Sequence, residues 1–143
     1  MTERESIIAA LQGNLWNVPG IRLVERNLHR TASVDDYPAV FVIDEGDDVT
    51  SSTSRYEYRR AWRISLAVFI GGSSDNAAVK ELSEFVRLVK SAMYATGKVV
   101  AGVHRGIVNE IRIGPVEFPA QGDHVVGQKI MFEIVYVETI PGR

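Results

Sequence analysis

Two stretches of the chain repeat apolar residues at the three- and four-residue spacing of an amphipathic helix. The first runs from Thr2 to Leu15 and opens with a capping pattern, in which Glu5 follows Thr2 by three residues. The second begins at Ser74 or Asp75 and ends before Gly97. We therefore expect two helices, with apolar faces made of Ile7, Ile8, Leu11 and Leu15 in the first and of Val79, Leu82, Val86, Val89 and Met93 in the second.

Elsewhere the apolar and polar residues alternate or run together as they do in strands, whose side chains point to opposite faces in turn. One strand contains Gly114 and Pro115, which indicate a bulge or an edge position. The order α-β-β-β-α-β-β predicts an α+β fold, mainly an antiparallel sheet of about five strands packed with two helices, in a single domain at 1–143. The expected strands are Ile21–Leu28, Ala39–Asp44, Arg55–Ile70, Ile107–Pro119 and Gly127–Ile140.

The strand expected at Arg55–Ile70 has two unlike halves. From Trp62 onward, every second residue is apolar, so that one face of the second half should be buried. The first half carries charge on both faces, because Arg59 alternates with Arg60. The stretch Asp44–Ser54 before it is acidic at its start and rich in Ser and Thr afterwards, which predicts a long, exposed and mobile hairpin loop.

The composition is that of a globular protein, with 45% apolar and 24% charged residues. The absence of cysteine excludes disulfides, thiolate catalysis and cysteine-based zinc sites, and it is typical of proteins that fold in a reducing cytosol. With 16 basic and 18 acidic residues, the net charge of -2 does not favour binding to DNA or to an anionic membrane. The start of the sequence does not resemble a signal peptide, and no apolar run approaches the roughly 18 residues of a membrane span.

Local signatures of catalysis and of metal binding are lacking. His29, His104 and His124 do not have the spacing that places two ligands on one helix face, although Asp123 stands beside His124. The phosphate-loop and nucleophile-elbow patterns are absent as well. We expect no catalytic, metal or cofactor residues and no enzyme activity; an enzyme with a dispersed site is the alternative that local motifs cannot reveal.

Two neighbouring segments carry opposite charges and are the candidates for binding partners. The acidic residues are Asp44, Glu45, Asp47 and Asp48, and the basic and aromatic ones are Arg55, Tyr56, Tyr58, Arg59 and Arg63. Arginine with tyrosine suits phosphates and stacked bases, but it is equally typical of protein interfaces. A solvated strand end is the third interpretation. The two segments could pair with each other, or each could meet the opposite segment of an identical neighbour and so build a head-to-tail ring.

Taken in order, the pieces of the chain resemble the tail terminator family of long-tailed bacteriophages, the minor tail protein U type. The resemblance covers nearly the whole chain and rests on structural patterns rather than on a chemical signature. The pieces are "ESIIAALQGNL", "VPGIRLVERN", "DYPAVFVIDEGDD", "YRRAWRISLAVFIGG", "AAVKELSEFVRLVKSAM", "GPVEFPAQGD" and "GQKIMFEIVYVE".

The resemblance implies a virion assembly protein without cofactors. Members of that family form a hexameric ring on the head-proximal end of the tail tube, end tube polymerisation and offer a surface to the head-tail connector. Genome DNA passes through the ring without sequence-specific binding. The implied partners are therefore further copies of the chain, the tail tube protein and the connector or neck protein, and the implied location is the virion tail, after assembly in the host cytoplasm. Two alternatives remain, another head-tail joining protein (neck or tail-completion) and a nucleic-acid-binding module that uses the Arg/Tyr segment.

Overall fold

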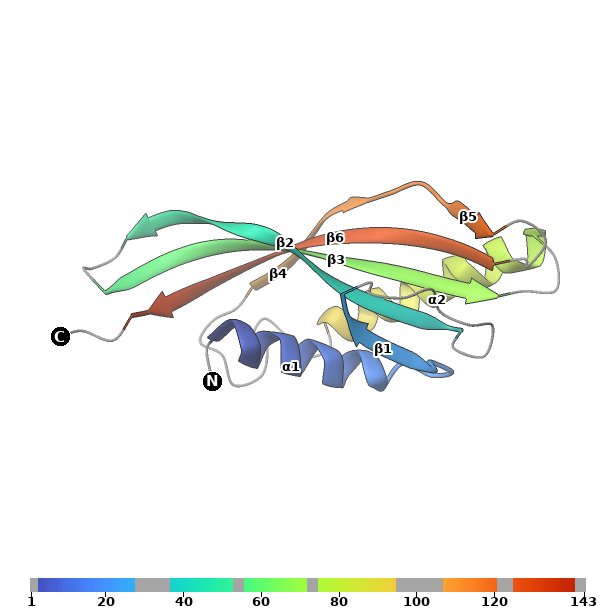
Figure 1. Cartoon of the computed structure of the whole chain (residues 1–143), viewed down its shortest axis with the longest axis horizontal. Coiled ribbons are helices and arrows are strands. Elements are labelled where there is room, and N and C mark those ends of the chain that lie inside the picture. The colour runs from blue at the N-terminus through green and yellow to red at the C-terminus, as the bar shows by residue number, and fades with distance from the viewer. Residues whose placement is uncertain are drawn as a thin grey trace.

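A computed structural model describes residues 3–27, 37–52, 56–71, 75–94, 107–120 and 125–140 (Figure 1). Helix α1 begins at Glu3 and helix α2 at Asp75, so the expected caps Thr2 and Ser74 lie outside the described residues. The order of the elements confirms the predicted α+β fold, and the strand predicted at 107–119 is divided into β4 and β5. The elements are α1 (Glu3–Trp16), β1 (Leu23–Arg26), β2 (Ala39–Ser52), β3 (Glu57–Gly71), α2 (Asp75–Tyr94), β4 (Ile107–Ile113), β5 (Glu117–Ala120) and β6 (Val125–Thr139).

The strands form one sheet in the order β1-β2-β3-β6-β4, with β5 paired to β6 beside β4. Strands β3 and β6 pair along their whole length, from Glu57 opposite Thr139 to Gly71 opposite Val125. Only β1 and β2 are parallel, and every other pair is antiparallel. The mainly antiparallel sheet is therefore confirmed, with β3 and β6 at its centre.

Both helices pack on one face of this sheet, and the alternation of β3 explains why. The side chains of Trp62, Ile64, Leu66, Val68 and Ile70 point to the helices and share one core with the apolar faces of α1 and α2. In α1 the expected face is buried completely, and in α2 only Val79 is left partly exposed. The predicted division of the strand into a charged half and a buried half is thus confirmed.

The opposite face of the sheet carries a smaller apolar cluster around Phe41. The ring of Phe41 meets that of Phe69 edge-on, with 5.8 Å between their centroids. Phe69 also lies directly over Gly127 of β6, and a Cβ at that position would approach the ring to 2.6 Å. Glycine occupies this place in β6 because the aromatic ring fills the space of a side chain.

The prediction of a loop at Asp44–Ser54 is wrong for the residues that the structure describes. Strand β2 continues to Ser52, and its residues from Asp47 onward pair with β3. The strand passes a bulge at Gly46, whose φ of 94° is accessible to glycine at little cost. Polar residues are tolerated here because this part of the strand is exposed, and Ser and Thr therefore do not identify a loop. Thr53 and Ser54 lie outside the described residues.

Candidate subunit interface

The far half of the sheet extends past α1 as an arm of three strands (Figure 1). We define the arm as Asp47–Ser52 of β2, Glu57–Trp62 of β3 and Ile134–Thr139 of β6. In Figure 1 its tip projects beyond the N-terminal end of α1. The arm contains or adjoins most of the residues that the sequence marked for binding partners.

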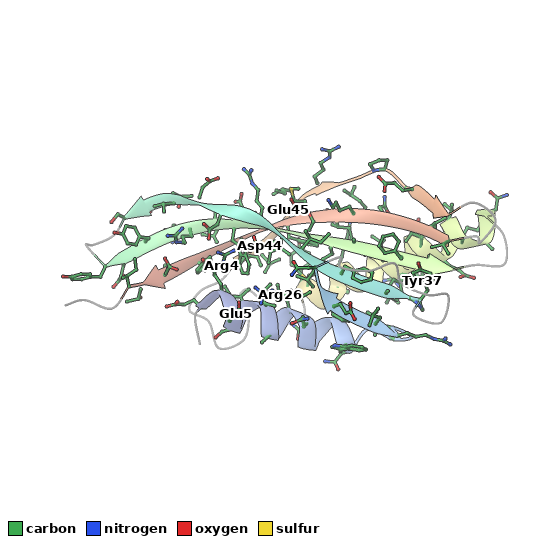
Figure 2. All side chains as sticks on the ribbon, in the orientation of Figure 1. Arg4, Glu5, Arg26, Tyr37, Asp44 and Glu45 are labelled. Atoms are coloured by element: carbon green, nitrogen blue, oxygen red, sulfur yellow. The ribbon has the colours of Figure 1, made fainter. Side chains whose placement is uncertain are left out.

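At the base of the arm, the carboxylate of Asp44 accepts several hydrogen bonds. The indole Nε1 of Trp62 donates to Oδ1 of Asp44 over 2.9 Å, and the backbone N–H of Gly46 donates to the same oxygen over 2.8 Å. Arg4 of α1 forms an ion pair with Asp44, and its guanidinium lies 4.5 Å from the centre of the Trp62 ring. Figure 2 shows Arg4 and Asp44 facing each other between the helix and the sheet.

A second carboxylate links the three strands of the arm. Asp47 of β2 accepts from the guanidinium of Arg60 over 3.0 Å and from the hydroxyl of Tyr136 over 3.3 Å. Arg60 in turn donates from Nε to Glu138 of β6 over 2.8 Å. Tyr136 is almost completely buried, so its hydroxyl requires this acceptor. Asp44 and Asp47 together with their donors form what we call the ionic junction.

The pKa values show that the charges of the ionic junction stabilise one another. Burial raises the pKa of Asp44, but the hydrogen bonds from Trp62 and Gly46 and the charge of Arg4 outweigh it, so the pKa is lowered. Burial and the negative charge of Asp47 both raise the pKa of Tyr136, so the tyrosine stays a donor. Near neutral pH the junction is thus a set of satisfied pairs with a structural role.

The structure separates the predicted interface residues into two groups. Asp44 and Asp47 form ion pairs within the chain, and Oε1 of Glu45 lies 3.4 Å from Nζ of Lys129. By contrast, no ion pair within the described ranges involves Asp48, Arg59 or Arg63, and all three are exposed. The pairing of the acidic segment with the basic one therefore occurs only between Asp47 and Arg60, because Asp44 and Glu45 pair with Arg4 and Lys129 outside both segments.

The exposed charges lie on the face of the sheet that points away from the helices. Arg59 and Arg63 share this face, as expected from their spacing, and Arg63 stands opposite Glu133 of β6. Asp48 stands opposite Ala61 on the same face. The outer face of the arm thus displays both signs of charge.

The aromatic residues of the basic segment are less exposed to a binding partner than the sequence suggested. Trp62 is fully buried, Tyr58 is half-buried, and Tyr56 is exposed at the tip of the arm. Arg55 lies outside the described residues. Because Trp62 and Arg60 are committed to the ionic junction, the surface on which bases could stack is smaller than the composition indicated.

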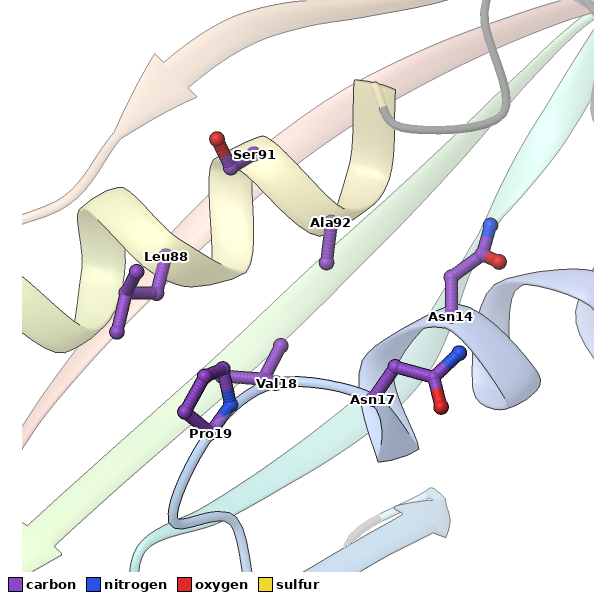
Figure 3. A pocket seen from close by; sticks show the side chains of 7 residues that line it. All are labelled: Asn14, Asn17, Val18, Pro19, Leu88, Ser91 and Ala92. Carbon is purple, nitrogen blue, oxygen red and sulfur yellow. The ribbon is translucent and has the colours of Figure 1, made fainter.

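Two of the cavities that described residues line differ in their titratable groups. Figure 3 shows the larger one, of about 310 Å³, between the end of α1 and α2. Its lining has no titratable side chain and consists of Asn14, Asn17, Val18, Pro19, Leu88, Ser91 and Ala92. The other, of about 220 Å³, lies on the outer face of the sheet beside Phe69, with Glu117 and Lys129 as its charged residues.

Metal binding and membrane insertion find no support in the described part of the chain. Within it, no group of three or more His, Cys, Asp or Glu side chains is placed to hold a metal ion. His29, His104, Asp123 and His124 lie outside the described residues. None of the described helices has both the length and the apolar character needed to cross a bilayer.

Several residues that matter here were missed from the sequence. Arg4 shares the buried face of α1, a signal that its spacing from Ile7, Ile8 and Leu11 contained. Ile111 and Ile113 of β4 were read only as part of an alternating strand, yet they are 45% and 42% exposed. Exposed apolar side chains on an edge strand are typical of an interface.

Comparison with known proteins adds a similarity to solved structures. No family model matches the chain, and no curated protein matches it. A chain from the structure "Virion of native gene transfer agent (GTA) particle" is similar with a TM-score of 0.40 and 11% sequence identity, over 95% of this chain and 92% of that chain. This degree of similarity does not assign a function, which therefore has to be argued from the residues of this chain.

Proposed function

We propose that this chain is a structural protein of a phage-like virion, and more specifically a tail terminator. Its copies form a ring of six on the head-proximal end of the tail tube, end tube polymerisation and provide the surface to which the head connector attaches. The resemblance of the sequence pieces to the tail terminator family supports this role, because they follow one another in the same order over nearly the whole chain.

The observation that carries the proposal is the outer face of the arm. Asp48, Arg59 and Arg63 are exposed there without ion pairs among the described residues, and no described helix covers them. A surface that displays both signs of charge is suited to binding a second protein surface with the complementary arrangement. In a ring of identical subunits, that second surface belongs to the neighbouring copy, to the tube protein or to the connector.

The ionic junction favours an assembly protein over an enzyme. A general acid or base has to reach a substrate. Here Asp44 is held by Trp62 and Arg4, and Asp47 is held by Arg60 and Tyr136. We therefore propose no catalytic activity, no cofactor and no metal for this chain. Genome DNA would pass through the ring without sequence-specific binding, and assembly would take place in the host cytoplasm.

The test is the assembly state of the purified protein, alone at high concentration and mixed with its tail tube protein. We expect closed rings with a central hole, most readily on tube ends, seen by mass measurement and by electron microscopy. A protein that stays monomeric and leaves tubes uncapped would contradict the proposal.

The same samples separate the alternatives. DNA binding that weakens steeply with salt, in the absence of rings, would favour the nucleic-acid-binding module. In infected cells that lack this chain, tails of normal length that fail to join heads would favour another head-tail joining protein.

A further inference from the structure

The described sheet ends on both sides in backbone that has no neighbouring strand. Strand β4 pairs with β6 alone, and β2 beyond Val42 pairs with β3 alone, because the short strand β1 stops there. An open edge presents unpaired N–H and C=O groups that can pair with a strand of another chain. The described part of each subunit therefore has two such edges, one on each side. On β4, the backbone N–H of Glu110 already donates to the hydroxyl of Tyr94 over 2.9 Å, so the remaining groups of β4 are the ones available for pairing.

The two open edges lie at the same height along the strands. Following the paired residues across β6 and β3 brings Ile107 of β4 level with Asp48 of β2. The same path brings Glu110 level with Asp44. A rotation about an axis parallel to the strands preserves height, so it can place one edge beside the other in the next copy. Tilting of the strands shifts the register without separating the edges.

The directions of the strands also fit. Each neighbour in the series β2, β3, β6 and β4 is antiparallel to the one before, so β4 runs opposite to β2. Under such a rotation, β4 of one copy and β2 of the next are antiparallel, and the outer face of the sheet stays on the same side. The antiparallel alternation thus continues from subunit to subunit, and a closed rotation gives a ring.

The side chains on the two edges complement each other. Ile111 and Ile113 are exposed on β4, and Val49 is 50% exposed on β2. Arg112 on β4 and Asp48 on β2 are exposed as well, and neither forms an ion pair with a described residue. They face each other when β4 is shifted along β2 into the register that places Asn109 opposite Ser51. Apolar contact with opposite charges beside it is what a heterologous interface between copies requires.

The bulge of β2 limits this pairing to few registers. The backbone N–H of Gly46 already donates to Asp44, so this donor of the bulge is not free, and the register of β2 shifts again between Val49 and Ser51. An irregular edge is a poor template for unrestricted strand addition, whereas a regular one invites aggregation. The bulge therefore favours a specific partner edge.

We infer that subunits join edge to edge, with β4 of one copy adding antiparallel to the segment Asp44–Ser52 of β2 in the next. This inference rests on the proposed ring and names the surface that closes it. The occupant of each edge is a second copy of the chain.

Cysteine cross-linking tests the inference directly, because the chain contains no cysteine of its own. Asn109→Cys on β4 is combined with Glu45→Cys, Asp48→Cys or Ser51→Cys on β2, since the tilt of the strands decides which of these registers forms; all four residues are exposed. After assembly and mild oxidation, at least one double variant should give a ladder of disulfide-linked species whose largest member counts the subunits. Single variants should give no ladder. The matched control is Ser83→Cys with Asn109→Cys, because Ser83 is also exposed but lies on helix α2 rather than on an edge of the sheet.

A second measurement uses the apolar side chains of the edge. Ile111→Lys with Ile113→Lys should raise the protein concentration needed for half-assembly by roughly tenfold or more. Trp16→Lys is the control, since it removes a side chain of similar exposure (48%) from α1. Circular dichroism should show that both variants are folded.

The outcomes for the edge and for the ring can be told apart. Rings in images, without cross-links in any double variant and with normal assembly of the Ile111/Ile113 variant, would overturn the edge inference and leave the proposed function standing. A ladder without closed rings would support edge pairing and count against the terminator. Equal cross-linking in the Ser83 control, or neither rings nor cross-links, would overturn the edge inference.

Discussion

The indole N–H of Trp62 donates a hydrogen bond to the carboxylate of Asp44. The largest fully buried side chain among the described residues is therefore bonded to an ionised group. Arg4 completes the arrangement by pairing with the same carboxylate and covering the Trp62 ring. Helix α1, β2 and β3 are thereby tied together where the arm leaves the core. A residue that the sequence assigned to an exposed loop is in fact an anchor of the fold.

Replacing this anchor should destabilise the protein. Asp44→Ala leaves a buried indole N–H without its acceptor and Arg4 without its partner, and we expect a loss of about 1–3 kcal/mol in the free energy of unfolding. The control is Asp48→Ala, an exposed carboxylate without an ion pair among the described residues, which should change it by less than about 0.5 kcal/mol. Urea denaturation of both variants measures the difference. Equal stability of the two variants would show that Asp44 is not an anchor.

Acid should weaken the fold in part through Asp44. Its pKa is lowered in the folded state, so its contribution is fully present above the pKa of the unfolded chain and is lost as the pH falls through the lower folded value. We expect the free energy of unfolding to decrease as the pH is lowered below 3.8, the ordinary pKa of aspartate. Asp44→Asn should make this dependence shallower, measured by denaturation at several pH values. An unchanged slope would assign the acid sensitivity to other carboxylates.

Gly127 should not tolerate a methyl group. Because a Cβ would lie 2.6 Å from the Phe69 ring, Gly127→Ala should cost about 1–3 kcal/mol through displacement of that ring. Gly71→Ala serves as the control, since nothing lies within 4 Å of its added Cβ. Phe69→Leu, combined with Gly127→Ala, should recover part of the loss. Thermal unfolding of these variants checks this, and a stable Gly127→Ala variant would contradict the close contact.

Reversing the charge of the outer face should weaken assembly but leave the subunit folded. Arg59→Glu with Arg63→Glu changes two exposed residues, so stability should change by less than about 0.5 kcal/mol for each. Like charges across an interface would disfavour the ring or the capped tube, and in infected cells tails should have uncontrolled length or fail to join heads.

The compensating change belongs at Asp48 alone. Asp47 is paired with Arg60 and Tyr136, so its reversal would damage the subunit itself. If Asp48 contacts the arginines of a neighbouring copy, an arrangement that excludes pairing of β4 with the same edge, Asp48→Lys should partly restore assembly. If the edges pair, Asp48 lies beside β4 and the restoration should fail. DNA affinity is measured in parallel. Normal assembly of the arginine variant together with lost DNA binding would mean that the arginines bind phosphate.

Hydrogen exchange should report the occupation of the open edge. In the free subunit, the amides of Asp47–Ser52 that do not bond to β3 face solvent and should exchange rapidly. On assembly they should slow, because the edge gains a neighbouring strand. The amides of β3 provide the internal control, since β3 is paired on both sides in either state. Equal exchange of the Asp47–Ser52 amides in the free and assembled protein would contradict an occupied edge.

Local sequence patterns were enough to predict the elements whose side chains pack in the core. The faces of α1 and α2 and the buried half of β3 follow from spacing alone, because burial and periodicity coincide there. The segment Asp44–Ser52 was missed because its stability comes from pairing with β3 and from donors far away in the sequence. Arg4 precedes Asp44 by 40 residues, and Tyr136 follows Asp47 by 89. Such partners leave no local signal, so the ionic junction could not be found from the sequence.

The central pairing of β3 with β6 also decides when the fold can be completed. Strands β4 and β5 precede β6 in the chain, yet β6 is the only described strand to which either is paired. During synthesis they must therefore wait until β6 has left the ribosome, and the distant contacts make this a comparatively slow step. An unfinished chain consequently lacks the β4 edge in its final place. A translation product that ends before β6 would therefore lack the paired β4 edge and could not join a neighbour through it.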